Sequence, residues 1–217
     1  MNRNLIPLIS LLVAGTFSTI ASAQDANSLK PYVGIEFGRV SFKDQTTVAS
    51  ILVNAVGGSA SSVQDTGFSV GRYFAGLYIN ENFGAEIAYI YSSTASATFS
   101  GVSRTAIAYT GTSSVQTTGV DYSALVRPSI SSGANGFFAR IGGHSLSVKN
   151  DVTILTGATS GAASATTSGT GLLYGVGYDG KISDKIDFRV GYTIYNTVAG
   201  ISGNDNSSFT VGILTKF

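Results

Sequence analysis

Eight segments of the sequence alternate apolar and polar residues with a period of two, the pattern of a β-strand whose two faces meet different surroundings. The segments lie near residues 31–42, 67–79, 83–92, 119–127, 136–146, 171–182, 186–195 and 208–217. Each is about as long as a tilted strand that crosses a bilayer, which takes about 9–11 residues. We therefore expect an all-β fold with eight antiparallel strands.

The predicted connections between these strands are of two kinds that alternate along the chain. The short or turn-like ones are residues 80–82, 128–135 and 183–185. The longer ones, rich in Ser, Thr, Ala and Gly, are about 43–66, 93–118, 147–170 and 196–207. Short turns at one end of an even-stranded meander and long loops at the other are the plan of an outer-membrane β-barrel.

The two faces of the predicted strands differ in their chemistry. One face is aliphatic and aromatic, with tyrosines near the strand ends, and Arg39 is its one charged residue. The opposite face combines glycine with five acidic and six basic residues, which we expect to form a lumenal charge network: Glu36, Glu86, Asp121, Asp179, Asp187, Arg72, Arg127, Arg140, Lys181, Arg189 and Lys216.

Alternation alone allows two kinds of barrel. A lipocalin-like soluble barrel would bury the apolar face, whereas an outer-membrane barrel turns that face towards lipid. A surface of glycine and few charges would keep a soluble barrel poorly hydrated, and tyrosines at strand ends match the aromatic girdles of membrane barrels. Balanced acids and bases can also pair inside a narrow lumen, where an unpaired charge costs several kcal/mol. We therefore expect an up-and-down transmembrane barrel.

Composition excludes several other classes of protein. Charged residues are 12% of the chain, about half the usual share of about 25%. The 13 basic and 12 acidic residues nearly cancel, so no strongly basic surface is present for nucleic acid. With no cysteine, the chain has neither a disulfide framework nor an N-terminal cysteine for lipid attachment.

The first residues resemble an export signal. Arg3 precedes an apolar stretch, and Ala21 and Ala23 are small residues in the positions that a signal peptidase reads. We expect a signal peptide over residues 1–23 and a single barrel domain over residues 24–217.

Several segments resemble a known family, the small outer-membrane barrels that include the transmembrane domain of outer membrane protein A, OmpX and Ail. "GLYINENFGAEIAYIY" at 76–91 is similar to a strand–turn–strand hairpin of that family. "LLYGVGYDGKISDKIDFRVGYTIY" at 172–195 is similar to its sixth and seventh strands, and "FTVGILTKF" at 209–217 to its last strand. The resemblance implies a monomer in the bacterial outer membrane, surrounded by lipid and lipopolysaccharide.

The resemblance also implies a role for the end of the chain. In such proteins the last strand and its terminal aromatic residue form a signal for the barrel-assembly machinery. Here the corresponding residues are Phe209, Val211, Ile213 and Phe217. Thr215 departs from the pattern, because the family usually has a larger apolar residue at that position.

Two hairpin halves, "INENFGAEIAYIY" at 79–91 and "ISDKIDFRVGYTIY" at 182–195, resemble each other. They would contribute the third and seventh strands of an eight-stranded barrel, which stand opposite one another. Glu86 and Arg189 occupy equivalent places after their turns. We therefore expect them to face each other across the lumen.

The one histidine, His144, has two interpretations. Some outer-membrane barrels are lipid A deacylases with a lipid-facing His and a Ser two residues apart. Here Leu146 follows at that spacing and Ser145 points to the other face, so we expect a buried, hydrogen-bonding histidine. Clusters of Cys and His with zinc-ligand spacing are absent from the sequence. We expect no enzyme and no cofactor.

The lumen of an eight-stranded barrel is just wide enough for side chains to fill it. Large residues of the lumenal set would occupy much of that space: Phe74, Tyr78, Leu125, Phe138 and Leu214. We expect a closed, non-enzymatic barrel that serves envelope structure or surface interaction. The alternative is a narrow channel for ions or small solutes, lined by the charged residues.

The long connections carry the remaining expectations. Residues 48–56 space apolar side chains as in a short amphipathic helix, which would either lie on the outer leaflet or cap the barrel mouth. Residues 156–169 are poor in charge and aromatic rings, and we expect a solvated, mobile loop there. A surface ligand would bind through the loops at 43–66, 93–118 and 147–170.

Overall fold

The structure is a computed structural model that describes residues 29–42, 59–64, 67–102, 107–128 and 136–217. Within these residues the chain forms ten β-strands and one short 3-10 helix, η1. Their bounds are β1 Lys30–Phe42, β2 Ser59–Gln64, β3 Gly67–Tyr78, β4 Phe83–Ser92, β5 Ala95–Val102, β6 Ala108–Val126, β7 Phe137–Thr156, β8 Thr159–Lys181, β9 Ile186–Tyr195, η1 Val198–Gly200 and β10 Asn206–Lys216.

Eight of the strands close into a ring. The order around it is β1, β3, β4, β6, β7, β8, β9, β10 and back to β1, and every pairing is antiparallel. Closure leaves no sheet edge inside the ring. The predicted eight-stranded barrel is therefore confirmed, and each predicted strand coincides with one strand of the ring.

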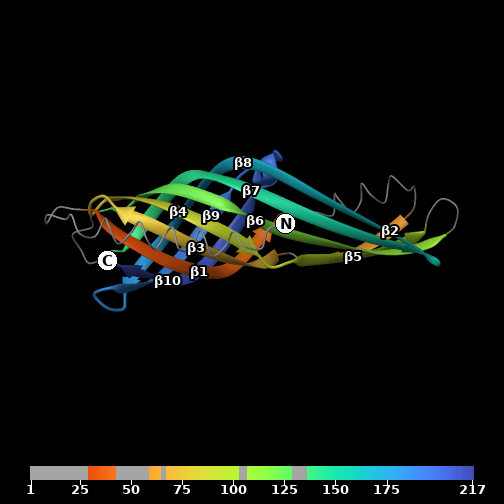
Figure 1. The fold of residues 1–217 in the computed structure, drawn as a ribbon, viewed down its shortest axis with the longest axis horizontal. Coiled ribbons are helices and arrows are strands. Elements are labelled where there is room, and N and C mark those ends of the chain that lie inside the picture. The colour runs from red at the N-terminus through yellow and green to blue at the C-terminus, as the bar shows by residue number, and fades with distance from the viewer. Residues whose placement is uncertain (1–28, 43–58, 65–66, 103–106, 129–135) are drawn as a thin grey trace, which may run out of the picture.

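The short turns lie together at one end of the barrel, which we call the turn end. Asn80 Oδ1 accepts hydrogen bonds from the backbone N–H groups of Asn82 and Phe83, both at 2.8 Å. Ser183 Oγ accepts one from the N–H of Ile186 at 3.1 Å. Such side-chain bonds to the backbone explain why these short polar segments turn. The chain also ends here, and Figure 1 shows the C-terminus beside β10.

A second, open sheet extends from the opposite end of the barrel. It consists of β2, β5, residues 108–117 of β6, residues 147–156 of β7 and residues 159–168 of β8. The order is β2–β5–β6–β7–β8, because β6, β7 and β8 run on past the ring and β5 pairs with the extended part of β6. Figure 1 shows this projecting sheet standing clear of the barrel.

The projecting sheet corrects the expectation that residues 156–169 form a mobile loop. Thr156 pairs with Thr159, and Gly157 adopts a φ of 57° in the two-residue turn between them, the conformation that favours glycine in a hairpin. The expectation was wrong because these strands contain mostly Ser, Thr, Ala and Gly. Small residues show no apolar alternation, although a continuous antiparallel ladder still holds them extended.

Two further predictions lie outside the described residues: the signal peptide at 1–23 and the amphipathic helix at 48–56. The connection at 128–135 is described at residue 128 alone. Among the residues that the structure describes, no helix is long and apolar enough to cross a membrane.

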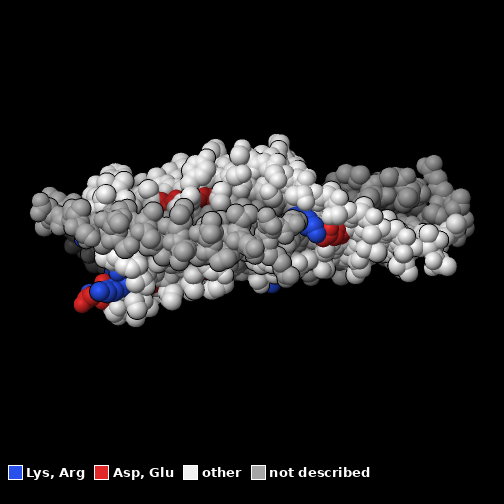
Figure 2. All heavy atoms as spheres, viewed as in Figure 1, with Lys and Arg blue, Asp and Glu red and all other residues white. Residues whose placement is uncertain are grey.

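The outer and inner faces of the barrel are reversed relative to a soluble protein. Large apolar side chains point outward and are exposed, among them Ile87 at 59% and Ile141 at 64%. Charged side chains such as Glu36 and Arg189 point inward and are 1% or less exposed. Figure 2 accordingly shows few charges on the visible face.

Glycines on the inner face make room for large rings. A Cβ atom on Gly76 would collide with the ring of Tyr32, and one on Gly177 would collide with that of Phe138. The glycines of the charged face are therefore part of the packing of the interior.

Replacement of Gly76 by Ala should destabilise the barrel by about 1–3 kcal/mol, the usual cost of overpacking a core. The measurement is equilibrium urea unfolding of the protein in lipid vesicles. Gly161→Ala is the matched control, because nothing lies within 4 Å of its added Cβ atom. Equal stability of the two variants would contradict the account of Gly76.

Candidate functional site

The barrel interior contains two apolar clusters separated by charge. The turn-end cluster comprises Tyr32, Phe74, Tyr78, Ala88, Leu125, Phe138 and Leu214. The sheet-end cluster comprises Val40, Phe68, Val70, Ile90, Ala95, Leu146, Leu173, Tyr195, Val198 and Ala199. On β1, Glu36 lies between Tyr32 and Val40, and on β3, Arg72 lies between Val70 and Phe74. We call the buried charges between the clusters the ionic layer: Glu36, Arg72, Glu86, Asp121, Arg140, Asp179 and Arg189.

Arg72 contacts three carboxylates in the ionic layer. Its Nη2 lies 2.6 Å from Glu86 Oε1, and its Nη1 lies 3.1 Å from Glu36 Oε2. Asp121 accepts two hydrogen bonds, from Nε at 2.9 Å and from Nη2 at 2.8 Å. This two-point geometry suits the planar guanidinium group. Strands β1, β3, β4 and β6 are thereby joined through one side chain.

Arg189 occupies the equivalent position on the other side of the layer. Its Nη1 lies 2.5 Å from Glu86 Oε2, so the structure brings together the two residues expected to face each other. Asp179 accepts two further hydrogen bonds from Arg189, at 2.6 and 3.0 Å. The guanidinium carbon also lies 4.7 Å from the ring centres of both Phe74 and Phe138, where the negative faces of the rings attract a cation.

Arg140 is held less tightly than the other two arginines. Its Nη2 lies 3.3 Å from Glu86 Oε1 and 3.8 Å from Glu36 Oε1. Its Nη1 donates a long hydrogen bond of 3.5 Å to Thr193 Oγ1. Arg140 Nε and Nη2, Glu36 Oε1 and Ser123 Oγ have no hydrogen-bond partner. This side of the ionic layer therefore contains the unsatisfied polar atoms.

The remaining charges of the predicted network lie nearer the turn end. Arg127 Nη2 lies 3.4 Å from Asp179 Oδ2, and Lys216 Nζ lies 2.8 Å from Asp187 Oδ1. Lys181 corrects the prediction of a lumenal side chain, because it is 67% exposed and pairs with Asp184 at 2.7 Å. It is the last residue of β8, and at the rim its long chain extends into water.

His144 is fully buried on the inner face. Its Nε2 hydrogen-bonds with the backbone oxygen of Asn196 at 2.8 Å, and its ring packs edge-on against Tyr195 at 5.6 Å. The Tyr195 hydroxyl donates to Asp121 Oδ2 at 3.2 Å. His144 therefore links the ionic layer to the loop after β9.

That loop folds back into the barrel mouth, which the sequence did not indicate. Val198 and Ala199 of η1 are 0% and 3% exposed, although the flanking residues were expected to form an open loop. Thr197 and Ala199 have φ angles of 57° and 58°, a costly region for residues with a Cβ atom. Asp205 Oδ1 accepts a hydrogen bond from Thr197 N–H at 3.0 Å and helps to hold this turn.

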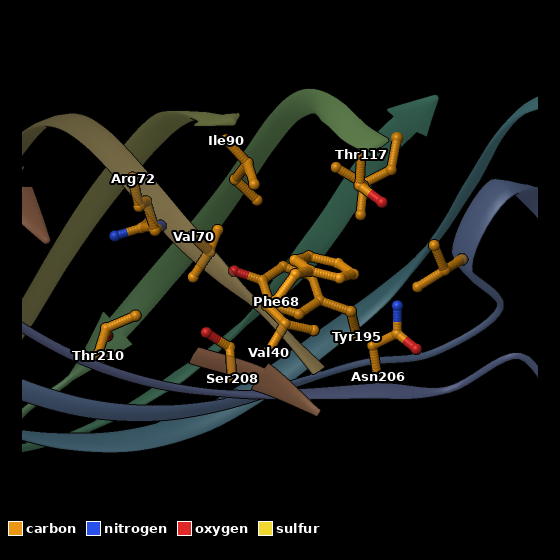
Figure 3. Close-up of a pocket in the computed structure, with 12 residues that line it drawn as sticks. Val40, Phe68, Val70, Arg72, Ile90, Thr117, Tyr195, Asn206, Ser208 and Thr210 are labelled. Carbon is orange, nitrogen blue, oxygen red and sulfur yellow. The ribbon is translucent and has the colours of Figure 1, made fainter. Parts of the chain in front are cut away.

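Below η1 lies a cavity of about 20 Å³, room for about one water molecule. Figure 3 shows Arg72 on one side of it and Tyr195 and Asn206 on the other. Asn206 Oδ1 has no hydrogen-bond partner. The cavity is thus a small gap between the sheet-end cluster and the ionic layer.

The residues of the expected assembly signal lie on the outer face of β10 and at the chain end. Phe209, Val211 and Ile213 are exposed towards the surroundings of the barrel. Phe217 is 63% exposed, and its backbone N–H bonds to Pro31 O at 3.0 Å. No group of three or more Cys, His, Asp or Glu in the described part of the chain has the arrangement of a metal site.

Arg189→Met should destabilise the barrel by about 3–5 kcal/mol, because it leaves buried carboxylates with too little positive charge. The charge-reversed double variant Glu86→Arg/Arg189→Glu should not recover stability, since the new arginine faces Arg72 and Arg140. Urea unfolding in lipid vesicles measures both. Asp184→Asn is the control at the rim, where loss of its exposed ion pair with Lys181 costs about 1 kcal/mol or less. Recovery in the double variant would mean that Glu86 and Arg189 act as an isolated pair.

Comparison with known proteins identifies a family and several similar folds. Residues 9–217 match the family model described as the outer membrane protein beta-barrel domain. No curated protein matches the chain. Among solved structures, Ail of Yersinia pestis has a TM-score of 0.47 at 11% identity, over 87% of this chain and 98% of its own.

Two other solved structures are similar over most of their length. OprG of Pseudomonas aeruginosa has a TM-score of 0.47 at 8% identity, over 88% of this chain and 97% of its own. Neisserial surface protein A has a TM-score of 0.38 at 15% identity, over 86% of this chain and 97% of its own. Because the family model spans nearly the whole sequence, the chain belongs to the outer-membrane protein β-barrel domain family and is a barrel of the bacterial outer membrane.

Proposed function

We propose that the protein is a non-enzymatic outer-membrane barrel with a closed interior, which serves envelope structure or surface interaction through its projecting sheet. The observation that carries this proposal is the filled lumen. Two apolar clusters and the ionic layer occupy its length, and the cavity beneath η1 holds about one water molecule.

The closed interior has a physical basis in the size of the ring. Eight strands leave a lumen just wide enough for side chains, and here arginines and aromatic rings fill it. Leu125 and Leu214 at the turn end are 0% and 1% exposed, and Val198 at the other end is 0% exposed. Solutes would have to displace packed side chains at both ends.

The orientation of the barrel supports a role outside the cell. Outer-membrane barrels keep short turns in the periplasm and longer connections outside, which would place the projecting sheet on the cell surface. Tyr89, Tyr122 and Tyr192 are exposed on the outer face, where their rings would contact lipid and lipopolysaccharide at the membrane interface. The barrel would act as a monomeric anchor for that sheet.

A narrow channel is the second candidate. It is favoured by the loose side of the ionic layer, where Arg140, Glu36 and Ser123 have atoms without hydrogen-bond partners. Water molecules could hydrogen-bond to those atoms and form a polar path beside Arg140. This path would still have to pass the two apolar clusters.

Permeation through the refolded protein in liposomes distinguishes the two candidates. We expect vesicles loaded with ions or small sugars to stay as tight as protein-free vesicles, because side chains fill the lumen. A reconstituted porin serves as the positive control, and faster gel mobility of the unheated sample verifies folding. Reproducible leakage would replace the closed barrel with the channel.

The expected assembly signal gives a separate test in cells. Phe217→Ala should lower the yield of folded barrel in the outer membrane, while refolding of the purified protein stays unchanged. Phe83→Ala is the matched control, because Phe83 is also an exposed aromatic residue at the turn end. Gel mobility of unheated membrane extracts measures the yield. Equal yields of the two variants would remove the role of Phe217 in assembly.

A further inference from the structure

One edge of the projecting sheet has no neighbour among the described residues. Strand β8 pairs with β7 as far as Thr159, but its pairing with β9 begins only at Leu173. Residues 159–172 of β8 have no partner on β9, because β9 ends at Tyr195 and η1 follows it. Gly200 of η1 lies against Gly169. Residues 159–168 are all exposed. We call this segment the β8 edge.

The β8 edge lacks the features that normally protect a free strand. Natural edges carry charges, proline or a bulge that prevents pairing with another chain. Residues 159–168 read TSGAASATTS and contain neither a charge nor a proline. The register with β7 is unbroken from Phe137–Tyr178 to Thr156–Thr159, so no bulge bends the strand away.

The charges of the projecting sheet lie at its base. Lys149 Nζ bonds to Asp151 Oδ2 at 2.6 Å, and Ser164 Oγ bonds to Asp151 Oδ1 at 2.5 Å. The hydrogen bonds from Lys149 and Ser164 lower the pKa of Asp151, so this carboxylate remains charged and paired at neutral pH. Figure 2 shows one adjacent pair of basic and acidic side chains where the projection begins and no charge on the visible described surface beyond it.

We propose that the β8 edge pairs antiparallel with the β8 edge of a second copy and joins two projecting sheets into one. The proposal rests on the proposed surface role of that sheet. An exposed edge binds an extended strand through main-chain hydrogen bonds. A second copy fits because an uncharged segment meets itself without repulsion, and its small side chains do not clash. A two-fold axis makes such a contact self-complementary.

The direction of β8 determines where the second copy lies. The strand runs from the free tip of the projection at Thr159 back into the barrel. Antiparallel pairing therefore places the two barrels at opposite ends of the joined sheet. Copies in one membrane would present their β8 edges in the same direction, so the contact joins apposed membranes. Many weak contacts between two surfaces then add through multivalency.

The test is docking between two populations of phosphatidylcholine vesicles that carry the full protein and different fluorescent labels. Wild-type vesicles should dock. In a two-fold antiparallel pair centred on Ala163, residue 162 lies diagonally across from residue 162 of the second copy. Ser160→Lys/Ala162→Lys and Ser160→Asp/Ala162→Asp vesicles should therefore each lose docking about tenfold, because like charges lie on one face of the joined sheet near its two-fold axis. Lysine vesicles mixed with aspartate vesicles should dock again, because opposite charges then meet across the strand pair.

The matched control is Thr153→Lys/Leu155→Lys. These two residues belong to β7 and pair with Ala162 and Ser160 of β8. The new charges therefore lie beside the substituted positions but one strand away from the edge. This variant should dock as the wild type does. Gel mobility of unheated samples confirms that every variant is folded.

Three results would overturn the proposal: wild-type vesicles that do not dock, β8 variants that dock as well as the wild type, or a mixture of lysine and aspartate vesicles that stays apart. The last result would assign the edge to a different partner. Leakage of the vesicles would overturn the closed barrel and leave the docking result unaffected, so failures of the two proposals are distinguishable.

Discussion

The rest of the barrel depends on one carboxylate, that of Glu86. Its two oxygens lie within 3.3 Å of Arg72, Arg140 and Arg189, and Tyr32 donates to it as well. A charge buried in this way is stable only when partners satisfy it from several sides. Those partners come from β1, β3, β7 and β9. Glu86 therefore joins strands around the whole ring, which the apolar outer surface cannot do because lipid contacts it.

The ionic layer also supports the closed interior that we propose. The arginines lie over the rings of Phe74 and Phe138, so charge and aromatic packing occupy the same cross-section. At the sheet end, His144 and Tyr195 connect this layer to the loop that inserts Val198 and Ala199. Buried apolar side chains lie towards each end of the lumen, and the function that we propose lies outside it.

The proposed surface role falls to the projecting sheet, whose composition is unusual for an exposed sheet. Its strands contain mostly small, uncharged residues. Its edge, residues 159–168 of β8, has no partner on β9, because the pairing of β8 with β9 begins only at Leu173. Within the barrel every strand has two neighbours, so edge pairing cannot occur there. The long strands β6, β7 and β8 therefore belong to a ring without strand edges at one end and to an open sheet at the other.

Period-two alternation of large residues determined much of this protein from sequence alone: the eight strands of the ring, the outward apolar face and the inward charges. The similar hairpins around Glu86 and Arg189 even indicated their contact. Tertiary structure decided what alternation does not encode. Barrel closure brought Arg72 and Arg140 to the same carboxylate as Arg189, and it left Lys181 in water at the rim. Residues 159–168 became a strand because β7 offered a continuous ladder, and Val198 became buried because the barrel mouth was the available apolar space. Small residues and short loops carry no periodic signal, so their structure follows from the neighbours that the fold supplies.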